Sequence, residues 1–250
     1  TTLIKRLEKQ TVSIHRIIVM NTEESMWNKE WEKLSDAMEV HHLTKEEFDH
    51  GATRRRGAEL SDAEILVFMT QDALPADRKL IGSLVTAIQE NEKVGAAYAR
   101  QLPKSDCGFL EKYTRSFNYP SESCLKTEKD LATRGIKTYF CSNVCAAYDH
   151  KIYNEIGGFP EHAIFNEDMI YAGWMVKKGY GVAYVAEARV YHSHNYSCAQ
   201  QFHRNFDLGV SQAEHPEIFE GVPSEGEGIR LVKKSMAYLT KTGHIWMIPG

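Results

Sequence analysis

Paired cysteines, long apolar runs and a strong excess of one charge are all missing from this sequence of 250 residues. The five cysteines are odd in number and contain no C-x-x-C pair, which favours free thiols in a reducing compartment over a disulfide framework. No apolar run approaches the roughly 20 residues that a membrane-spanning helix needs. The formal net charge is −4, so we expect no general attraction to nucleic acid.

Several signatures of nucleotide-binding and hydrolytic enzymes are absent as well. The chain has no G-x-G-x-x-G, no G-x-x-x-x-G-K-[S/T], no H-E-x-x-H and no G-x-S-x-G. These absences argue against a dinucleotide oxidoreductase, a P-loop NTPase, a zinc metalloprotease and an α/β-hydrolase. Hydrophobic residues make up 42% of the chain and charged residues 26%, which is ordinary for a globular protein.

Apolar strands and helical patterns alternate along the first half of the chain. Short apolar runs at 16–20, 64–69 and 94–98 predict buried strands, and the apolar spacing over 80–88 predicts a helix between two of them. Residues 23–37 have the pattern of a surface helix. Strands that alternate with helices predict the α/β class, with a mostly parallel sheet and flanking helices.

The second half begins with a stretch of weak periodicity at 101–136, which we interpret as an excursion over the carboxyl edge of the sheet. The elements expected after it are a strand within 137–148, a helix over 166–178, a strand or strand pair over 181–192, and helices over 197–210 and 228–239.

The run at 64–69 stops at the polar tripeptide Thr70-Gln71-Asp72, and Pro75, which has no N–H, is expected to close it. Open α/β sheets bind ligands beyond the carboxyl ends of their strands, so Asp72 is a candidate ligand-binding carboxylate. The alternative is that Asp72 caps the helix expected near Asp77, because aspartates are common in turns.

Three arginines, Arg54, Arg55 and Arg56, lie in the stretch 50–60 and are expected near the start of a helix. The partial positive charge of a helix N-terminus makes such a cluster unfavourable unless an anion binds there, and a diphosphate would suit. The alternative is a solvated patch in which Arg55 pairs with Glu59 one turn later.

Two acidic residues, Glu167 and Asp168, follow Asn166 at the expected start of another helix. They could act as a general base, or they could simply be the acidic first turn that helices favour. The spacing alone does not choose between these interpretations.

Two histidines, His192 and His194, alternate along an expected strand and would therefore point to one face. Such a pair could bind a metal ion or a phosphate, or could be a structural hydrogen-bonded pair. Zinc binding with Cys198 is disfavoured, because the ligand count is too small.

Taken together, these motifs resemble those of a known family. They occur in the order His50–Arg54, Thr70–Pro75, Gly157–Phe159, Asn166–Met169 and Val190–Tyr196. In this order they are similar to the inverting, GT-A-fold glycosyltransferases of family 2, and especially to the bacterial rhamnosyltransferase branch. The resemblance covers nearly the whole chain. It implies the GT-A fold, a nucleotide-sugar donor, a divalent Mg or Mn ion, and a carboxylate base.

The resemblance also implies roles for single residues. Asp72 matches the last aspartate of the family's metal-binding D-x-D motif, in which Thr70 replaces the first. Asp168, with Glu167 beside it, matches the catalytic base. His192 matches the histidine that completes the metal and diphosphate site, and His194 is a second candidate ligand.

The remaining roles concern the two substrates. The residues expected on the donor side are Asn21, Arg54, Gln71, Asp72 and Arg204, and those expected on the acceptor side are Asn143 and Glu167. The segment Gln201–Asn205 resembles the family's Q-x-x-R-W motif, but Asn205 replaces the tryptophan, which argues against a processive synthase. The family's first strand would precede Thr1.

The predicted reaction is transfer of rhamnose from dTDP-rhamnose to a saccharide or lipid-linked saccharide in bacterial surface polysaccharide synthesis, in the cytoplasm at the inner face of the membrane. Residues 1–196 are expected to form the GT-A catalytic domain, with 101–148 on the acceptor side, and 197–250 a C-terminal helical extension. The alternatives are a sugar nucleotidyltransferase and a non-catalytic nucleotide-sugar-binding module.

The helix expected at 228–239 is amphipathic. Its apolar face and flanking lysines are Ile229, Val232, Met236 and Leu239, with Lys233, Lys234 and Lys241. An apolar face bordered by lysines suits a helix lying on an anionic membrane surface, so a peripheral membrane contact is expected. The alternative is that this face packs on the protein's own domain.

Overall fold

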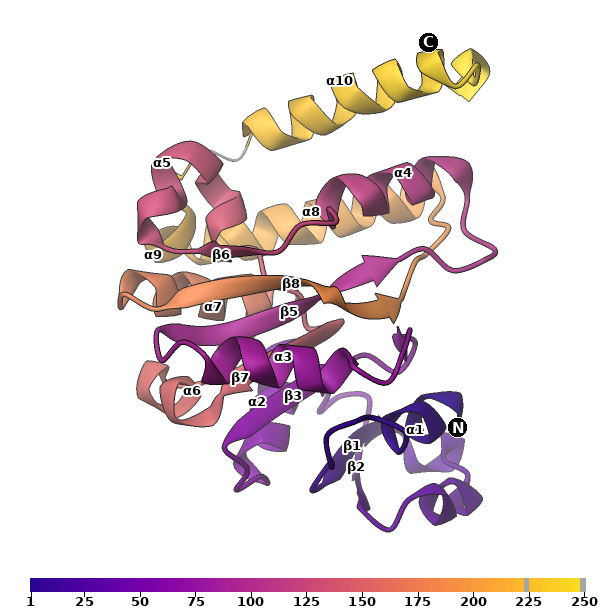
Figure 1. Ribbon diagram of the computed structural model, residues 1–250, viewed down its shortest axis with the longest axis vertical. Helices are drawn as coiled ribbons and strands as arrows, with labels where there is room; N and C mark the ends of the chain where they lie inside the picture. The colour runs from indigo at the N-terminus through magenta and orange to yellow at the C-terminus, as the bar shows by residue number, and fades with distance from the viewer. Residues whose placement is uncertain (223–224, 248–250) are drawn as a thin grey trace.

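The computed structural model describes residues 1–222 and 225–247 (Figure 1). Its main sheet contains six strands, and a smaller sheet contains two parallel strands. The main sheet has the order β3 (Ile65–Met69), β7 (Cys145–Asp149), β5 (Val94–Leu102), β8 (Gly181–Tyr191) and β4 (Leu74–Pro75), with β6 (Cys124–Lys126) also paired to β8. The small sheet pairs β1 (Ile17–Thr22) with β2 (Met38–Leu43).

The three strands that carry the candidate site run in one direction. Both β3 and β5 are antiparallel to β7, and β5 is parallel to β8, so the carboxyl ends of β3, β5 and β8 lie at the same edge. The α/β class is confirmed, but β7, β4 and β6 run the other way, so the sheet is more mixed than predicted. The cause for β7 is its starting point: Cys145 pairs with Met69 at the carboxyl end of β3, so the strand must run back.

Helices cover both faces of the main sheet (Figure 1). One face packs against α1 (Thr2–Leu7) and α3 (Leu80–Gln89), and the other against α2 (His50–Glu59), α6 (His150–Ile156) and α7 (Glu167–Lys177). The predicted helices at 80–88 and 166–178 are confirmed within a residue or two at their ends.

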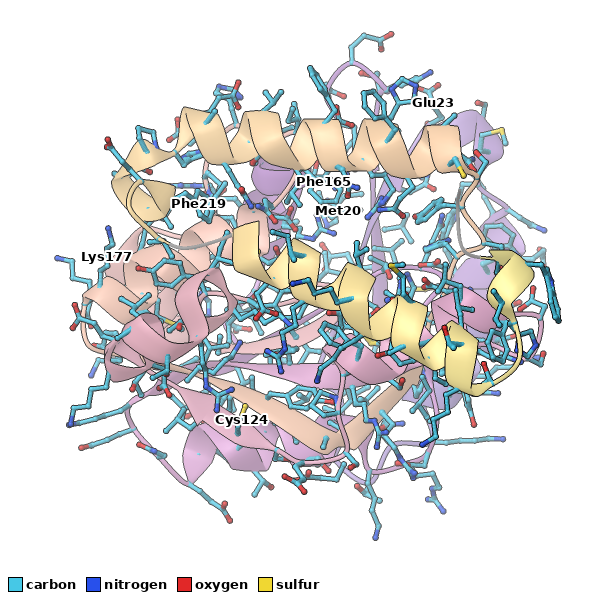
Figure 2. The ribbon with its side chains drawn as sticks, turned by 90° about the horizontal axis from the view of Figure 1, so that it is seen from above. Met20, Glu23, Cys124, Phe165, Lys177 and Phe219 are labelled. Atoms are coloured by element: carbon cyan, nitrogen blue, oxygen red, sulfur yellow. The ribbon has the colours of Figure 1, made fainter. Side chains whose placement is uncertain are left out.

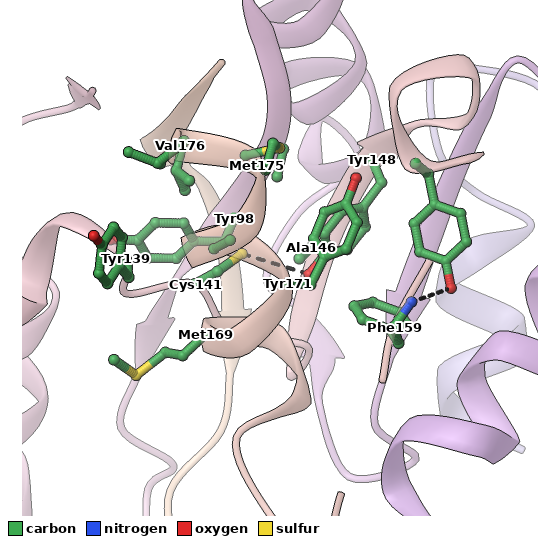
Figure 3. Close-up of a cluster of buried hydrophobic side chains, with 14 of the residues drawn as sticks. Tyr98, Tyr139, Cys141, Ala146, Tyr148, Phe159, Met169, Tyr171, Met175 and Val176 are labelled. Atoms are coloured by element: carbon green, nitrogen blue, oxygen red, sulfur yellow. Dashed lines mark hydrogen bonds between the residues drawn. The ribbon is translucent and has the colours of Figure 1, made fainter. Parts of the chain in front are cut away.

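The core on the α7 side is aromatic (Figure 3). Tyr148, Phe159 and Tyr171 are fully buried, and their ring centroids lie 5.3–5.4 Å apart in edge-to-face pairs. Each such pair stabilises by about 0.5–1.5 kcal/mol beyond the area it buries. The cluster joins β7, the loop before α7 and α7 itself, and so fixes where the acidic first turn of α7 lies.

Residues 103–144 connect β5 to β7 and include most of the excursion predicted at 101–136, but they contain a helix that the sequence pattern did not reveal. This helix, α4 (Phe109–Asn118), packs against α10 (Glu225–Lys241), and the ring of Tyr113 stacks on that of Tyr238 at 4.3 Å. Its apolar side chains meet another peripheral helix instead of the sheet. The excursion also contains β6, α5 (Leu131–Arg134) and two 3-10 turns at 128–130 and 135–138.

The chain continues with α8 (Cys198–Glu214), α9 (Pro216–Phe219) and α10. The helices predicted at 197–210 and 228–239 are thus confirmed as α8 and α10. Figure 1 shows α10 over α4, at the end of the molecule opposite β1 and β2. The domain boundary predicted after residue 196 falls at Ser197, which caps α8, and remains a prediction. Of the helices among residues 1–222 and 225–247, none combines the length and hydropathy needed to cross a membrane.

The prediction of a helix at 23–37 is wrong. The segment forms two short 3-10 turns, η1 (Glu24–Met26) and η2 (Lys29–Leu34), and Met26 is 76% exposed. The side chain of Asn28 accepts a hydrogen bond from the N–H of Glu30, a local bond that competes with a continuous helix.

Two further expectations need correction. Pro75 does not simply end the β3 run, because it belongs to the short edge strand β4 and pairs with Val190, a position where a missing N–H is tolerated. The strand expected within 137–148 is limited to β7, because residues 135–138 form a 3-10 turn.

The expectation of free thiols is confirmed, since all five cysteines are unpaired.

The helix α2 and the loop that precedes α7 meet at Gly51. A Cβ atom at Gly51 would lie 2.3 Å from the carbonyl oxygen of Pro160, whereas one at Gly57 would meet only the flexible side chain of Met20, at 3.5 Å or more. We expect Gly51→Ala to lower the free energy of unfolding by about 1–3 kcal/mol, because α2 must move away from the loop.

The matched control is Gly57→Ala in the same helix, which should leave stability unchanged or raise it by about 0.5–1 kcal/mol. Urea denaturation of both variants measures the difference. Equal effects of the two substitutions would contradict the close approach at Gly51.

Candidate functional site

Three potential metal ligands converge beyond the carboxyl ends of β3 and β8. The Oδ2 atom of Asp72 lies 3.4 Å from Nε2 of His192 and 3.2 Å from Nε2 of His194, and the two Nε2 atoms are 3.0 Å apart. These atoms all lie within 4.8 Å of one another, so a single ion could contact all three. One carboxylate and two imidazoles are a donor set that divalent metals accept, so these residues fit such an ion.

The histidines meet in a different way from the one predicted. Because β8 ends at Tyr191, His192 and His194 lie in the following loop and do not alternate along a strand. Asp72 is free for this cluster, and the alternative that it caps the next helix is wrong. That helix, α3, begins at Leu80, and Asp77 accepts the hydrogen bond from the N–H of Lys79.

The charges in this cluster favour metal ligation. Contact with the imidazole of His192 is the main reason that the pKa of Asp72 lies well below its ordinary value, and the nearby His194 adds to the effect. Burial, with His192 beside it, lowers the pKa of His194 and favours its neutral form. Metal ligation needs an ionised carboxylate and neutral imidazoles.

The second cluster joins the start of α7 to the loop before β7. The N–H of Asn143 donates to Oδ2 of Asp168 at 2.9 Å, and its side-chain Nδ2 donates to Oε1 of Glu167, also at 2.9 Å. Arg54 Nη1 lies 3.1 Å from the same Glu167 oxygen. The hydroxyl of the buried Tyr148 donates to Oδ1 of Asn143 at 2.7 Å, which fixes the orientation of the amide.

The environment of Asp168 makes it a proton acceptor near neutral pH. Burial among protein atoms, and then the neighbouring Glu167, raise the pKa of Asp168 to about 7, although the side chain keeps some contact with solvent. The backbone N–H groups of Asn143 and Met169 offset only part of this rise. A general base is most effective when its pKa lies near the working pH.

Local sequence features explain how α2 and α7 come together. Asp49 caps α2 by accepting from the N–H groups of Gly51 and Ala52, and the same carboxylate accepts from the N–H of Ala163 in the loop before α7. Asn166, with φ of +70°, then turns the chain into α7. This arrangement places α2 beside the acidic first turn of α7.

The three arginines do not form the helix-terminal anion site that was predicted. Because α2 begins at His50, Arg54 to Arg56 lie beyond its first turn. Arg55 lies 3.5 Å from Glu59, as in the alternative interpretation, and also donates to the carbonyl oxygen of Phe159. Arg54 is the one of the three that reaches the site, through its ion pair with Glu167.

Two aromatic rings, those of Tyr196 and His194, lie between Arg204 and the rest of the metal-ligand cluster. Its guanidinium carbon is 4.8 Å from the ring centre of Tyr196, and the Tyr196 ring stacks on that of His194 at 5.0 Å. The same guanidinium lies 4.9 Å from the ring of Phe165, which is seen between α8 and α10 in the view from above (Figure 2).

The other residues expected on the donor side lie at strand ends. Asn21, on β1, contacts Nδ1 of His42 on β2 at 2.9 Å and donates to the carbonyl oxygen of Glu23. Gln71 is exposed beside Asp72. Donor binding by these residues, and acceptor binding by Asn143 and Glu167, remain predictions.

Four residues of the site belong to none of the motifs recognised in the sequence. Lys104 Nζ lies 3.8 Å from Oδ2 of Asp72, and Tyr148 orients Asn143. Gln101 contacts His192 Nδ1 at 2.9 Å and accepts a hydrogen bond from Arg115. No sequence pattern marked any of the four, and Gln101, which is only 2% exposed, lies in the stretch that was interpreted as an excursion.

Comparisons of sequence identify similar proteins. A model described as Glycosyl transferase family 2 matches residues 1–157. The O-antigen chain rhamnosyltransferase RfbN of Salmonella typhimurium is 42% identical over 212 residues, which cover 83% of this chain and 67% of that protein. WbaN of Salmonella anatum, another O-antigen chain rhamnosyltransferase, is 40% identical over 82% of this chain and 65% of its own length. The chain thus spans about two thirds of these relatives.

Comparisons of structure identify the same kind of fold. The mannosyltransferase PcManGT from Pyrobaculum calidifontis, in complex with GDP-Man and Mn²⁺, has a TM-score of 0.62 and 14% identity over 97% of this chain and 67% of that one. S. aureus TarS residues 1–349, in complex with UDP-GlcNAc, has a TM-score of 0.58 and 14% identity over 95% of this chain and 66% of that one. These similarities support the predicted GT-A fold.

The raised pKa of Asp168 should make stability depend on pH. The folded state holds the Asp168 proton up to a pH of about 7, while the unfolded chain loses it near its ordinary pKa of 3.8, so stability falls as pH rises through this interval. Asp168→Asn has no such proton to lose. We therefore expect its stability relative to the unchanged protein to be higher at pH 8 than at pH 5, by about 2–3 kcal/mol.

Urea denaturation at the two pH values measures this difference. The exposed Asp207 on α8 provides a control, since Asp207→Asn makes the same change of charge outside the site. If the Asp168 and Asp207 variants responded alike to pH, the elevated pKa of Asp168 would be wrong.

Proposed function

The chain belongs to glycosyl transferase family 2, and on this basis we propose that it transfers rhamnose from dTDP-rhamnose to a hydroxyl group of a saccharide, with inversion at the sugar carbon. The observation that carries the proposal is the meeting of two clusters at one sheet edge. The ligand set Asp72, His192 and His194 suits a donor diphosphate with its metal, and Asp168 suits an acceptor hydroxyl.

The relatives support the choice of sugar and the biological role. RfbN and WbaN are both O-antigen chain rhamnosyltransferases, so the favoured acceptor is a growing saccharide, free or lipid-linked, of a bacterial surface polysaccharide. The choice of dTDP as the nucleotide rests on the resemblance to the rhamnosyltransferase branch. The place of action we propose is the cytoplasm, at the inner face of the membrane.

We further propose that Asp72, His192 and His194 hold a divalent ion, Mg²⁺ or Mn²⁺. Two imidazole ligands make the set better suited to Mn²⁺, since Mg²⁺ strongly prefers oxygen ligands. The similar mannosyltransferase structure contains Mn²⁺. When bound, the ion supplies positive charge that neutralises the leaving diphosphate. Lys104 and Arg204 lie close enough to this cluster to add further positive charge.

The chemistry at the sugar follows from the position of Asp168. The acceptor oxygen forms a bond to the sugar carbon from the face opposite the diphosphate, the bond from that carbon to the diphosphate oxygen breaks, and its electron pair leaves with the nucleoside diphosphate. Asp168 takes the proton of the acceptor hydroxyl. Glu167 is already bonded to Arg54 and Asn143, so we assign it to positioning the base and the acceptor.

Transfer from dTDP-rhamnose to a rhamnose-accepting saccharide, followed by product analysis, tests the function. Asp168→Asn should lower turnover by about 100-fold or more, because the chemical step loses its base, while affinity for the donor stays within about twofold. Turnover of the variant near that of the unchanged protein would leave Asp168 as a helix-capping residue only.

The same assay separates the alternatives. Formation of a nucleotide sugar from a sugar phosphate and a nucleoside triphosphate would identify a nucleotidyltransferase. Tight donor binding with no product from any acceptor would identify a binding module.

The exposed face of α10 supports a peripheral membrane contact. Ile229, Val232 and Met236 are 55%, 57% and 44% exposed, and Trp246 just beyond the helix is 76% exposed. Leu239 does not belong to this face, because it is buried. The rings of Phe109 and Tyr113 instead hold the opposite side of α10 through stacking on Tyr238. The apolar stripe therefore remains available beside the exposed Lys233.

We expect weak, salt-sensitive binding to liposomes that contain anionic lipid, and we expect Lys233→Glu with Lys234→Glu to reduce it severalfold, because the like charges repel. Co-sedimentation at low salt measures the binding. The control is Lys151→Glu with Lys178→Glu, which makes the same change of charge at exposed positions on α6 and at the end of α7. Pelleting no greater than with neutral lipid would contradict the contact.

A further inference from the structure

Gln101, at the end of β5, contacts three polar groups although it is almost completely buried. Its Oε1 atom accepts a hydrogen bond from Arg115 Nη1, and the same oxygen lies 2.9 Å from Nδ1 of His192. Its Nε2 atom donates to Oγ of Ser142 at 3.0 Å. Gln101 is 2% exposed, so water cannot easily replace these partners.

Arg115 determines which end of the Gln101 amide faces His192. A guanidinium group can only donate hydrogen bonds, so the amide atom that it meets must be the oxygen. Arg115 is itself held in place by an ion pair with Glu111 one turn earlier on α4, at 2.5 Å. The oxygen of Gln101 is therefore directed at His192 by a partner outside the metal-ligand cluster.

This orientation determines which nitrogen of His192 can bind a metal. Since Oε1 of Gln101 can only accept, Nδ1 of His192 must carry a hydrogen. Nε2 is then the only ring atom that can present a lone pair, and it is the atom 3.4 Å from Asp72 and 3.0 Å from His194. Ligating histidines are commonly oriented in this way by a carbonyl or carboxylate on their other nitrogen.

We propose that Gln101 is a positioning residue of the metal site, which fixes both the ring orientation of His192 and the nitrogen that it offers. The inference rests on the proposed metal-binding function of Asp72, His192 and His194. Loss of such an outer partner typically weakens metal binding by about 10- to 100-fold. The side chain of Gln101 bonds to Ser142, Arg115 and His192, so we assign it a role that acts through His192 and no direct role toward the substrates.

The amide nitrogen of Gln101 connects this residue to the loop beside Asp168. Ser142, which accepts from its amide, directly precedes Asn143, whose N–H and side chain hold Asp168 and Glu167. One side chain thus connects the metal-ligand cluster to the loop that positions the acidic pair. The bond to His192 uses the amide oxygen and the bond to Ser142 uses the amide nitrogen, so substitutions can remove one interaction without the other.

Calorimetric titration with Mn²⁺ alone, without donor, tests the proposal. Gln101→Met keeps a similar shape but removes both polar groups, and we expect it to weaken Mn²⁺ binding by about 10- to 100-fold. Gln101→Glu keeps an oxygen for both His192 and Arg115, so binding should stay within about threefold of the unchanged protein or become tighter. Ser142→Ala removes only the hydrogen bond between Gln101 Nε2 and Ser142, and it should leave Mn²⁺ affinity unchanged.

A second measurement needs no metal. In ¹⁵N NMR spectra of the metal-free protein, Nδ1 of His192 should show the shift of a protonated ring nitrogen, and Gln101→Met should lose this fixed state while Gln101→Glu retains it. A variant that is merely less well packed would change its thermal midpoint without following this pattern.

Three results would overturn the inference. Binding of Mn²⁺ by Gln101→Met as tight as in the unchanged protein, together with loss of binding in Asp72→Ala, would reject the role of Gln101 but keep the metal site. Equal weakening by Gln101→Met and Gln101→Glu would show that only packing matters. Failure of the unchanged protein to bind Mn²⁺ would reject the metal site and the role of Gln101 together.

Discussion

The site depends on keeping two adjacent carboxylates, Glu167 and Asp168, together at the start of a largely buried helix. Like charges this close are unfavourable in an environment with little water. The protein compensates them unequally, because Arg54 and the side chain of Asn143 satisfy Glu167, while Asp168 receives only backbone N–H groups. Burial, and then the charge of Glu167, therefore act mainly on Asp168 and raise its pKa to about 7, the property a general base needs.

Much of the surrounding structure serves this pair and its neighbouring metal-ligand cluster. The buried rings of Tyr148, Phe159 and Tyr171 hold α7 against β7, and the hydroxyl of Tyr148 also directs the amide of Asn143. On the metal side, Gln101 plays the corresponding part for His192. Each cluster is thus oriented by a side chain that is almost completely buried.

The peripheral helices have a different relation to the fold. The helix α10 is attached chiefly through stacked aromatic rings on α4, and it keeps an apolar stripe exposed. Because α4 belongs to the excursion that begins after Gln101, contacts made by α10 would adjoin the side that we propose for the acceptor. An acceptor carried by a lipid would approach from a surface of this kind.

The sequence by itself determined the α/β class, the strand that ends before Asp72, the helix opened by Glu167 and Asp168, and the family, because apolar periodicity and ordered motifs are local properties of the chain. It did not determine the direction of β7 or the helix α4, because these depend on partners distant in sequence. The helical pattern at 23–37 was misleading because it took no account of the local hydrogen bond accepted by Asn28. Nor could it reveal Gln101, Arg115 and Tyr148 as parts of the site. Their roles come from single hydrogen bonds across the fold, and only the tertiary structure brings those donors and acceptors within reach.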